Sequence, residues 1–232
     1  MDVAASVTLL GTWRASVAGA EVTVPAACQR IVALLGLSGR LSRPYLAGTL
    51  WGDLDDVRAL RRLRSTLWRL PAAARPLIEV TDTALRLAPG VDVDVARVTA
   101  MAHALTEGGG EVAPDEALAL LSGPDLLVGW YDDWVVPERE RINQLRVHAL
   151  EALADRLTAG RHFGAAIEAG FAAIRADPLR ESAHRIVIRA HLAEGNPASA
   201  LRQYDRYRRL LHSQLGLDRP SADMVALVES IG

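Results

Sequence analysis

The segment DDVRALRRLRSTLWRL, residues 55–70, constrains the fold of this chain more than any other stretch. On a helix with 3.6 residues per turn, its apolar side gathers Leu60, Leu63, Leu67 and Leu70. The opposite side carries Arg58, Arg62, Ser65 and Arg69, with Arg61 at its edge. Arg64 and Trp68 fall on the flank nearer the leucines. The segment therefore predicts a helix with one buried leucine face and one arginine-rich face.

The arginine-rich face is unusual because no acidic residue occurs between Val57 and Leu70. Surface helices ordinarily interleave acids with bases, since opposite charges four residues apart stabilise a helix. Closely spaced like charges repel one another unless an anion lies against them. Guanidinium groups bind phosphates, and the O6 and N7 edge of guanine, through two-point contacts. We therefore favour DNA contact over a simple solvated surface for this face.

The elements around this helix predict a specific arrangement. Three short strands and two helices are expected before it, at residues 6–11, 12–20, 21–25, 26–39 and 42–52. Ser42 is a candidate N-cap of the second helix, with Pro44 in its first turn. After the arginine-rich helix, apolar residues alternate on both sides of Asp82-Thr83, which predicts a hairpin. A third helix followed at once by a hairpin indicates a winged helix-turn-helix of the response-regulator effector type.

The front and back of the chain differ in charge and in pattern. Residues 1–90 hold 11 arginines against 7 acids, whereas residues 91–232 hold 15 against 21. From Asp94 onward the sequence reads as successive helices separated by loops rich in Gly and Pro. We therefore expect an α+β fold at residues 1–90, followed by an all-α domain at residues 91–232.

A short internal repeat, called the 34-residue echo below, refines the expectation for the helical domain. The pair Ala166-Ile167 recurs as Ala200-Leu201, 34 residues later. This spacing is the period of tetratricopeptide helix pairs, in which a small residue lets two helices approach closely. Such pairs bury their apolar faces by stacking, and the stack offers a concave surface to a protein or peptide. The sequence thus predicts tetratricopeptide-like helical repeats.

Motifs for catalysis and for metal or cofactor binding do not occur in the sequence. The six histidines and Cys28 form no zinc pattern, and no phosphate-binding glycine motif follows a strand. His184 and His191 lie two turns apart, for which a core or surface role outweighs a metal site. A packing role, rather than a stacking platform, is expected for Trp130, Tyr131 and Trp134. An enzyme, a bound metal and a cofactor are therefore not expected.

The cellular setting follows from three further features. The sequence has no run of eighteen apolar residues, shows no evident signal peptide, and has one cysteine, which allows no internal disulfide. We therefore expect a cytoplasmic protein without a membrane partner.

Several segments carry a resemblance to a known family. The front half looks like the DNA-binding half of bacterial SARP-type activators, the antibiotic regulatory proteins, in VTLLGTWRASVAG, CQRIVALLGL, LAGTLWGD, RRLRSTLWRL and IEVTDTALRLAPGVDVDV. The back half looks like their partner module, the bacterial transcriptional activator domain, from Gly129 to Gly216. The resemblance covers nearly all of the chain, and it is more specific in the second half.

The resemblance implies a transcription factor. Such proteins bind direct repeats in double-stranded DNA near a promoter, often as side-by-side dimers, and recruit RNA polymerase through its sigma factor. Carried over position by position, the contacts of the third helix with DNA are those of Arg58, Arg61, Arg62, Ser65 and Arg69. The corresponding hairpin contacts are those of Thr81, Thr83 and Arg86.

The start of the first helix adds one more candidate contact, and the sequence departs from the family at two places. Arg30, with Gln29, matches a family KQR motif at a helix start, where backbone N–H groups also hold phosphate. Cys28 replaces the lysine of that motif. The stretch GDLDD, between the second and third helices, is shorter than the proline-containing family loop that touches polymerase.

Two functions stay open at this point. The acid-free arginine face favours a DNA-binding regulator, with a homodimer formed through the helical domain or on DNA. The modest positive balance of the front half and the shortened loop favour a protein-interaction module whose winged helix no longer reads DNA. A gel shift on randomised DNA distinguishes them.

Overall fold

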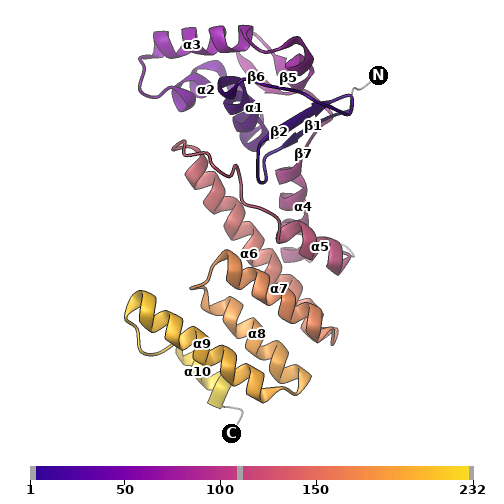
Figure 1. The fold of residues 1–232 in the computed structure, drawn as a ribbon, viewed down its shortest axis with the longest axis vertical. Helices are drawn as coiled ribbons and strands as arrows, with labels where there is room; N and C mark the ends of the chain where they lie inside the picture. Colours follow the sequence, from indigo (N-terminus) through magenta and orange to yellow (C-terminus); the bar gives the residue numbers. More distant parts are fainter. Residues whose placement is uncertain (1–3, 109–111, 230–232) are drawn as a thin grey trace. The chain divides into compact units, whose positions relative to one another are not determined.

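A computed structural model describes residues 4–108 and 112–229 of the chain (Figure 1). The chain forms two compact units, and neither is a continuous stretch of sequence. Unit 1 comprises Met1–Arg97 and Pro124–Ile142, and unit 2 comprises Val98–Gly123 and Asn143–Gly232. The segment 124–142 thus packs with the winged helix, although it lies well beyond the expected boundary near residue 90.

Unit 1 opens with a four-stranded sheet in the order β3-β2-β1-β7. Its strands are β1 (Ala5–Thr8), β2 (Arg14–Val17), β3 (Ala20–Glu21) and β7 (Val91–Val93). The first three strands were expected, but β3 ends at Glu21 rather than at Pro25. Strand β7 was not expected, because three residues of VDV give too short an alternation to distinguish a strand from a loop. It pairs in parallel with β1, with Ala5 opposite Val91.

Three helices and a second sheet complete the winged helix-turn-helix. The helices are α1 (Ala26–Ser38), α2 (Arg43–Leu50) and α3 (Asp56–Trp68). The 3-10 helix η1 (Ala72–Leu77) leads into the hairpin of β5 (Ile78–Val80) and β6 (Ala84–Leu87), and β4 (Leu41–Ser42) pairs with β6. The predicted cap is confirmed, since the Ser42 hydroxyl accepts from the Tyr45 N–H. Asp55 caps α3 in the same way, through the Arg58 N–H. This part of the fold agrees with the prediction.

The buried side of α3 differs from the predicted leucine face. The side chains buried there belong to Ala59, Leu63 and Thr66, together with Leu70 just after the helix. Leu60 and Leu67 are only half-buried. The prediction counted leucines alone, so it placed the core side about a sixth of a turn away from its true position, at roughly 100° per residue.

The segment 124–142 is attached to the end of β1 by backbone hydrogen bonds. The Gly11 N–H donates to the Asp125 carbonyl over 2.7 Å, and the Leu127 N–H donates to the Leu9 carbonyl over 2.8 Å. Arg139 then holds the loop that follows, because its guanidinium donates to the carbonyls of Leu126, Leu127 and Trp130. One arginine therefore satisfies three loop carbonyls that would otherwise need water.

Helices α4 (Asp94–Thr106) and α6 (Val135–Ala159) each contribute residues to both units. Asp94, at the start of α4, has its carboxylate 2.9 Å from both the Leu9 and the Leu10 N–H groups. A charged acceptor on two backbone donors is a strong contact. It fixes the start of α4 to the end of β1 within unit 1.

Unit 2 is all-helical, as predicted. Its remaining helices are α5 (Pro114–Leu121), α7 (Phe163–Ala176), α8 (Glu181–Glu194), α9 (Pro197–Leu215) and α10 (Ala222–Glu229). Helices α7 and α8 lie side by side, and so do α8 and α9 (Figure 1). Ala166 and Ala200, the two members of the 34-residue echo, are fully buried. At Gly170 an added Cβ would lie 2.5 Å from Val187 Cγ2, so α7 and α8 approach too closely for a side chain.

His184 lies in the core of this helical unit, as the sequence favoured. Its Nε2 donates to the Pro178 carbonyl over 2.9 Å, and its Nδ1 accepts from the Gln203 amide over 2.8 Å. Its ring also packs on Tyr207, with centroids 4.4 Å apart. Burial lowers the pKa of His184, so the neutral ring is the form that these contacts fit. Across the described ranges, no helix is both long and apolar enough to cross a membrane.

Candidate nucleic-acid interface

Helix α3 turns a strongly basic surface away from the core of unit 1. At about 100° per residue, the side chains opposite the buried face are those of Val57, Arg61 and Trp68, with Arg64 beside them. Val57 is 66% exposed and Trp68 is 85% exposed. Arg62 and Arg69 lie about a quarter turn from this outward direction. The predicted flank position nearer the leucines is thus wrong for Trp68, which points outward, whereas Arg64 does lie beside Leu60 and Leu63.

The arginines of α3 differ in what they contact. Arg58 pairs with the capping Asp55 at 3.2 Å. Arg61, Arg62, Arg64 and Arg69 form no ion pair with any acid in the part of the chain that the structure describes. The Ser65 hydroxyl donates to the Arg62 carbonyl. Four guanidinium groups therefore retain their full hydrogen-bonding capacity for an external anion.

Two of the three candidate residues of the hairpin already have hydrogen-bond or ion-pair partners within the protein. The Thr81 hydroxyl accepts from the Ala84 N–H and donates to its carbonyl, so it closes the turn. Arg86 pairs with Glu79 across the strands at 2.8 Å. Arg43, at the start of α2, donates to the Thr81 carbonyl and holds the turn against α2. Of the three hairpin candidates, Thr83 is the one whose side chain has no partner within the described residues.

A groove of about 530 Å³ runs between α3, the start of α2 and the hairpin turn. Leu60 and Leu63 form its apolar floor, while Arg64 and Thr83 lie at its sides. Arg64 and the hairpin turn are therefore on the same side of α3. Arg69, by contrast, lies near Cys28 of α1, where its charge opposes the rise that burial causes in the pKa of that thiol.

Cys28 joins α1 to α3. It is 1% exposed, and its thiol donates to the Thr66 carbonyl over 3.3 Å. Burial raises the pKa of the thiol, which keeps it protonated and able to donate. Cys28 is therefore a buried contact between two helices.

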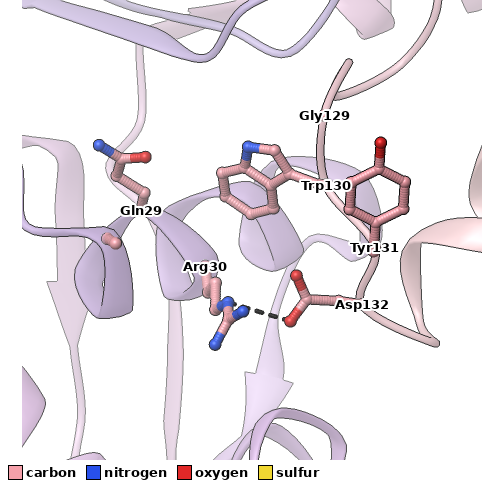
Figure 2. A pocket seen from close by; sticks show the side chains of 7 residues that line it. Gln29, Arg30, Gly129, Trp130, Tyr131 and Asp132 are labelled. Atoms are coloured by element: carbon pink, nitrogen blue, oxygen red, sulfur yellow. Dashed lines mark ion pairs between the residues drawn. The ribbon is translucent and has the colours of Figure 1, made fainter.

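The start of α1 shows why Arg30 is a weaker candidate than the helix arginines. Its Nε lies 3.0 Å from the Asp132 carboxylate, and Figure 2 shows this ion pair at the edge of a pocket of about 380 Å³. The Gln29 amide donates to the Val24 carbonyl. An anion at this helix start would have to compete with Asp132 for Arg30.

The same pocket settles the roles of the nearby aromatic residues. Trp130 packs edge-on against Trp134, with centroids 6.2 Å apart, so the expected packing role is confirmed for both. For Tyr131 it is wrong, because that side chain is 90% exposed (Figure 2). The sequence could not distinguish them, since all three continue one apolar run.

Fold and surface together define a class of protein, a winged helix joined to tetratricopeptide-like repeats. The model of the bacterial transcriptional activator domain matches residues 91–231. The chain therefore belongs to the bacterial transcriptional activator domain family, which agrees with the expected resemblance to SARP-type regulators that carry this domain.

Two individual proteins are similar to this chain. Regulatory protein AfsR of Streptomyces coelicolor is 32% identical over 201 residues, which cover 81% of this chain and 20% of that protein. The chain thus spans about a fifth of the length of that relative. The solved structure of Mycobacterium tuberculosis EmbR in complex with a low affinity phosphopeptide is 23% identical, with a TM-score of 0.71. That match covers 99% of this chain and 65% of the solved chain, and it shows a shared fold.

Proposed function

We propose that this chain binds double-stranded DNA through α3 and the β5–β6 hairpin and thereby regulates transcription. One observation carries the proposal: four arginines on and just after α3 have no acid partner among the described residues, although acids are abundant elsewhere in the chain. A winged helix places its third helix in the major groove. Arginine side chains without internal partners are suited to phosphates and guanine edges there.

The activating role is the second part of the proposal. The match to a transcriptional activator domain supports an activator that recruits RNA polymerase. The loop between α2 and α3 runs only from Trp51 to Asp55 and folds as a turn, with the Leu54 N–H donating to the Trp51 carbonyl. We therefore assign polymerase contact to surfaces other than this loop. We also retain residue 90 as the functional boundary, with DNA binding before it and effector or dimer contacts after it.

Binding to DNA is tested by fluorescence anisotropy of the full chain on randomised duplexes over a range of salt concentrations. Wild-type protein should bind, and its affinity should fall steeply as salt rises, because displaced counterions return to the DNA. Arg62→Ala should weaken binding to all sequences alike and reduce the salt slope by about 1, as expected for one phosphate contact.

The matched control is Arg175→Ala, which removes one exposed arginine from α7 in the helical unit. It changes the net charge by the same amount and should leave binding unchanged. If wild-type protein binds no duplex at any salt concentration, the alternative stands, in which the winged helix is a module for binding another protein.

A further inference from the structure

We propose that the outward stripe of α3, formed by Arg61, Arg64 and Trp68, reads bases in the major groove, with Trp68 contacting the methyl group of a thymine. This inference rests on the proposed DNA binding and adds which side chains determine the sequence. The leucine pattern alone places Arg62 and Arg69 opposite the core. The burial seen in the structure instead assigns base contacts to the outward stripe and leaves Arg62 and Arg69 at its edges.

The burial of α3 supports this orientation. Ala59, Leu63 and Thr66 face the core, so the side chains of Arg61 and Trp68 point the opposite way. A recognition helix presents its outward side to the floor of the groove and its flanks to the phosphates on either side. Arg62 and Arg69, a quarter turn away, are thereby placed as phosphate contacts.

The hairpin gives a second, independent indication of the same side. Arg64 and Thr83 line one groove, so the turn of the hairpin and Arg64 share a side of α3. In a winged helix both the third helix and the hairpin face DNA. Arg69 lies on another side, near Cys28 of α1.

Trp68 is the unusual member of the stripe. A tryptophan that is 85% exposed leaves a large apolar surface in water, which is unfavourable unless a partner covers it. Arg64 and Arg61 lie one and two turns before it, and their charge favours a polyanion over an apolar protein surface as that partner. In the major groove the C5 methyl of thymine is the apolar group available, and guanine offers two acceptors to each arginine. The preferred site should therefore hold guanines within a few base pairs of a thymine.

The experiment begins with selection of preferred sites from a randomised duplex library by the full wild-type chain. Each thymine in the selected site is then replaced by deoxyuridine, which removes only the methyl group. Wild-type affinity should fall about fourfold at one thymine, as expected for the loss of one buried methyl. Trp68→Ala should bind the original site on the order of tenfold more weakly and should show no further loss with deoxyuridine.

Three more variants test the role of each side chain. Trp68→Leu keeps an apolar side chain and should retain part of the sensitivity to the methyl group. Arg64→Ala should lose its preference for one guanine, at a cost of about fivefold to a hundredfold. Tyr131→Ala removes another exposed aromatic side chain from the same unit and should change nothing. Far-UV circular dichroism should be the same for all four variants, because each altered side chain is exposed.

The outcomes separate this inference from the function on which it rests. If wild-type protein binds DNA without any sequence preference, base reading by α3 is refuted while DNA binding stands. If Trp68→Ala keeps wild-type affinity and sensitivity to deoxyuridine, the inference is wrong and Trp68 belongs to a protein contact. If wild-type protein binds no DNA, both proposals fail together.

Discussion

The arginines of α3 and those of the helical repeats are the same residue type in opposite electrostatic surroundings. In unit 2, Arg180 binds Glu151 through two nitrogens, and Arg189 lies 2.8 Å from Asp155. Both contacts join the region of α8 to α6. On α3, Arg61 and Arg64 have no such acid within the described ranges. Arg180 and Arg189 therefore stabilise the fold of the helical unit, whereas Arg61 and Arg64 are available to a ligand.

The contrast can be tested separately in each unit because the tryptophans report on only one of them. All five tryptophans, Trp13, Trp51, Trp68, Trp130 and Trp134, lie in unit 1. Tryptophan fluorescence thus follows the unfolding of unit 1, whereas far-UV circular dichroism follows the helices of both.

The largest effect is expected from a charge placed beneath the arginine surface. Leu63 is 1% exposed, so Leu63→Asp buries an unpaired carboxylate and should cost at least about 4 kcal/mol. Unfolding followed by tryptophan fluorescence should show unit 1 unfolded or strongly destabilised. Leu67→Asp is the matched comparison, and it should cost much less because Leu67 is half-buried. Equal losses from the two variants would contradict the assigned orientation of α3.

An intermediate effect is expected from removing one ion-paired arginine of the helical unit and, separately, one unpaired arginine of α3. Arg180→Ala leaves the carboxylate of Glu151 without its two-point partner and should lower the stability of the helical unit by about 2–3 kcal/mol. Binding to DNA at a temperature where the variant is folded should not change. Arg61→Ala should do the reverse, weakening DNA binding while leaving thermal unfolding as in wild type.

The comparison breaks down if each variant affects both properties. Denaturation by circular dichroism and DNA binding by anisotropy, measured on the same preparations, provide the two readouts. Loss of stability in Arg61→Ala would mean that its side chain belongs to the fold of unit 1.

The smallest effect concerns pH. Because burial lowers the pKa of His184 in the folded protein, the unfolded chain takes up a proton at higher pH than the folded one. The stability from the neutral ring is therefore fully present above the unfolded value of about 6.5 and is lost as pH falls through the window below it. Chemical denaturation at pH 7.5 and at pH 5.5 should show a smaller free energy of unfolding at the lower pH.

His184→Gln should flatten this pH dependence, since the titrating group is gone. His212→Gln is the control, because His212 is an exposed residue paired with the exposed Asp218. An unchanged pH dependence in His184→Gln would assign the effect to other groups.

Much of the architecture could be predicted from local sequence. The cap at Ser42, the hairpin around Asp82-Thr83 and the succession of helices after Asp94 all depend on neighbours within a few residues. The 34-residue echo likewise predicted helix pairs whose small residues, Ala166 and Ala200, are buried where two helices meet. The basic surface of α3 could also be predicted, because the absence of acids between Val57 and Leu70 is visible in the sequence alone.

The tertiary structure decided which side of α3 faces outward. Ala59 and Thr66 are buried through their contacts with other elements, which neither residue type nor spacing could indicate, and their burial turns Trp68 and Arg64 away from the core. Contacts across long sequence distances also brought Asp132 to Arg30 and Asp94 to the end of β1. Periodicity predicts that a helix has a buried face and an exposed face. Only the elements that pack against the helix fix its rotation about its own axis, and thus which residues lie on each face. The sequence by itself thus determined that this protein carries an arginine-rich helix without interleaved acids, and the packing of α3 against its neighbours decided which side chains that helix presents.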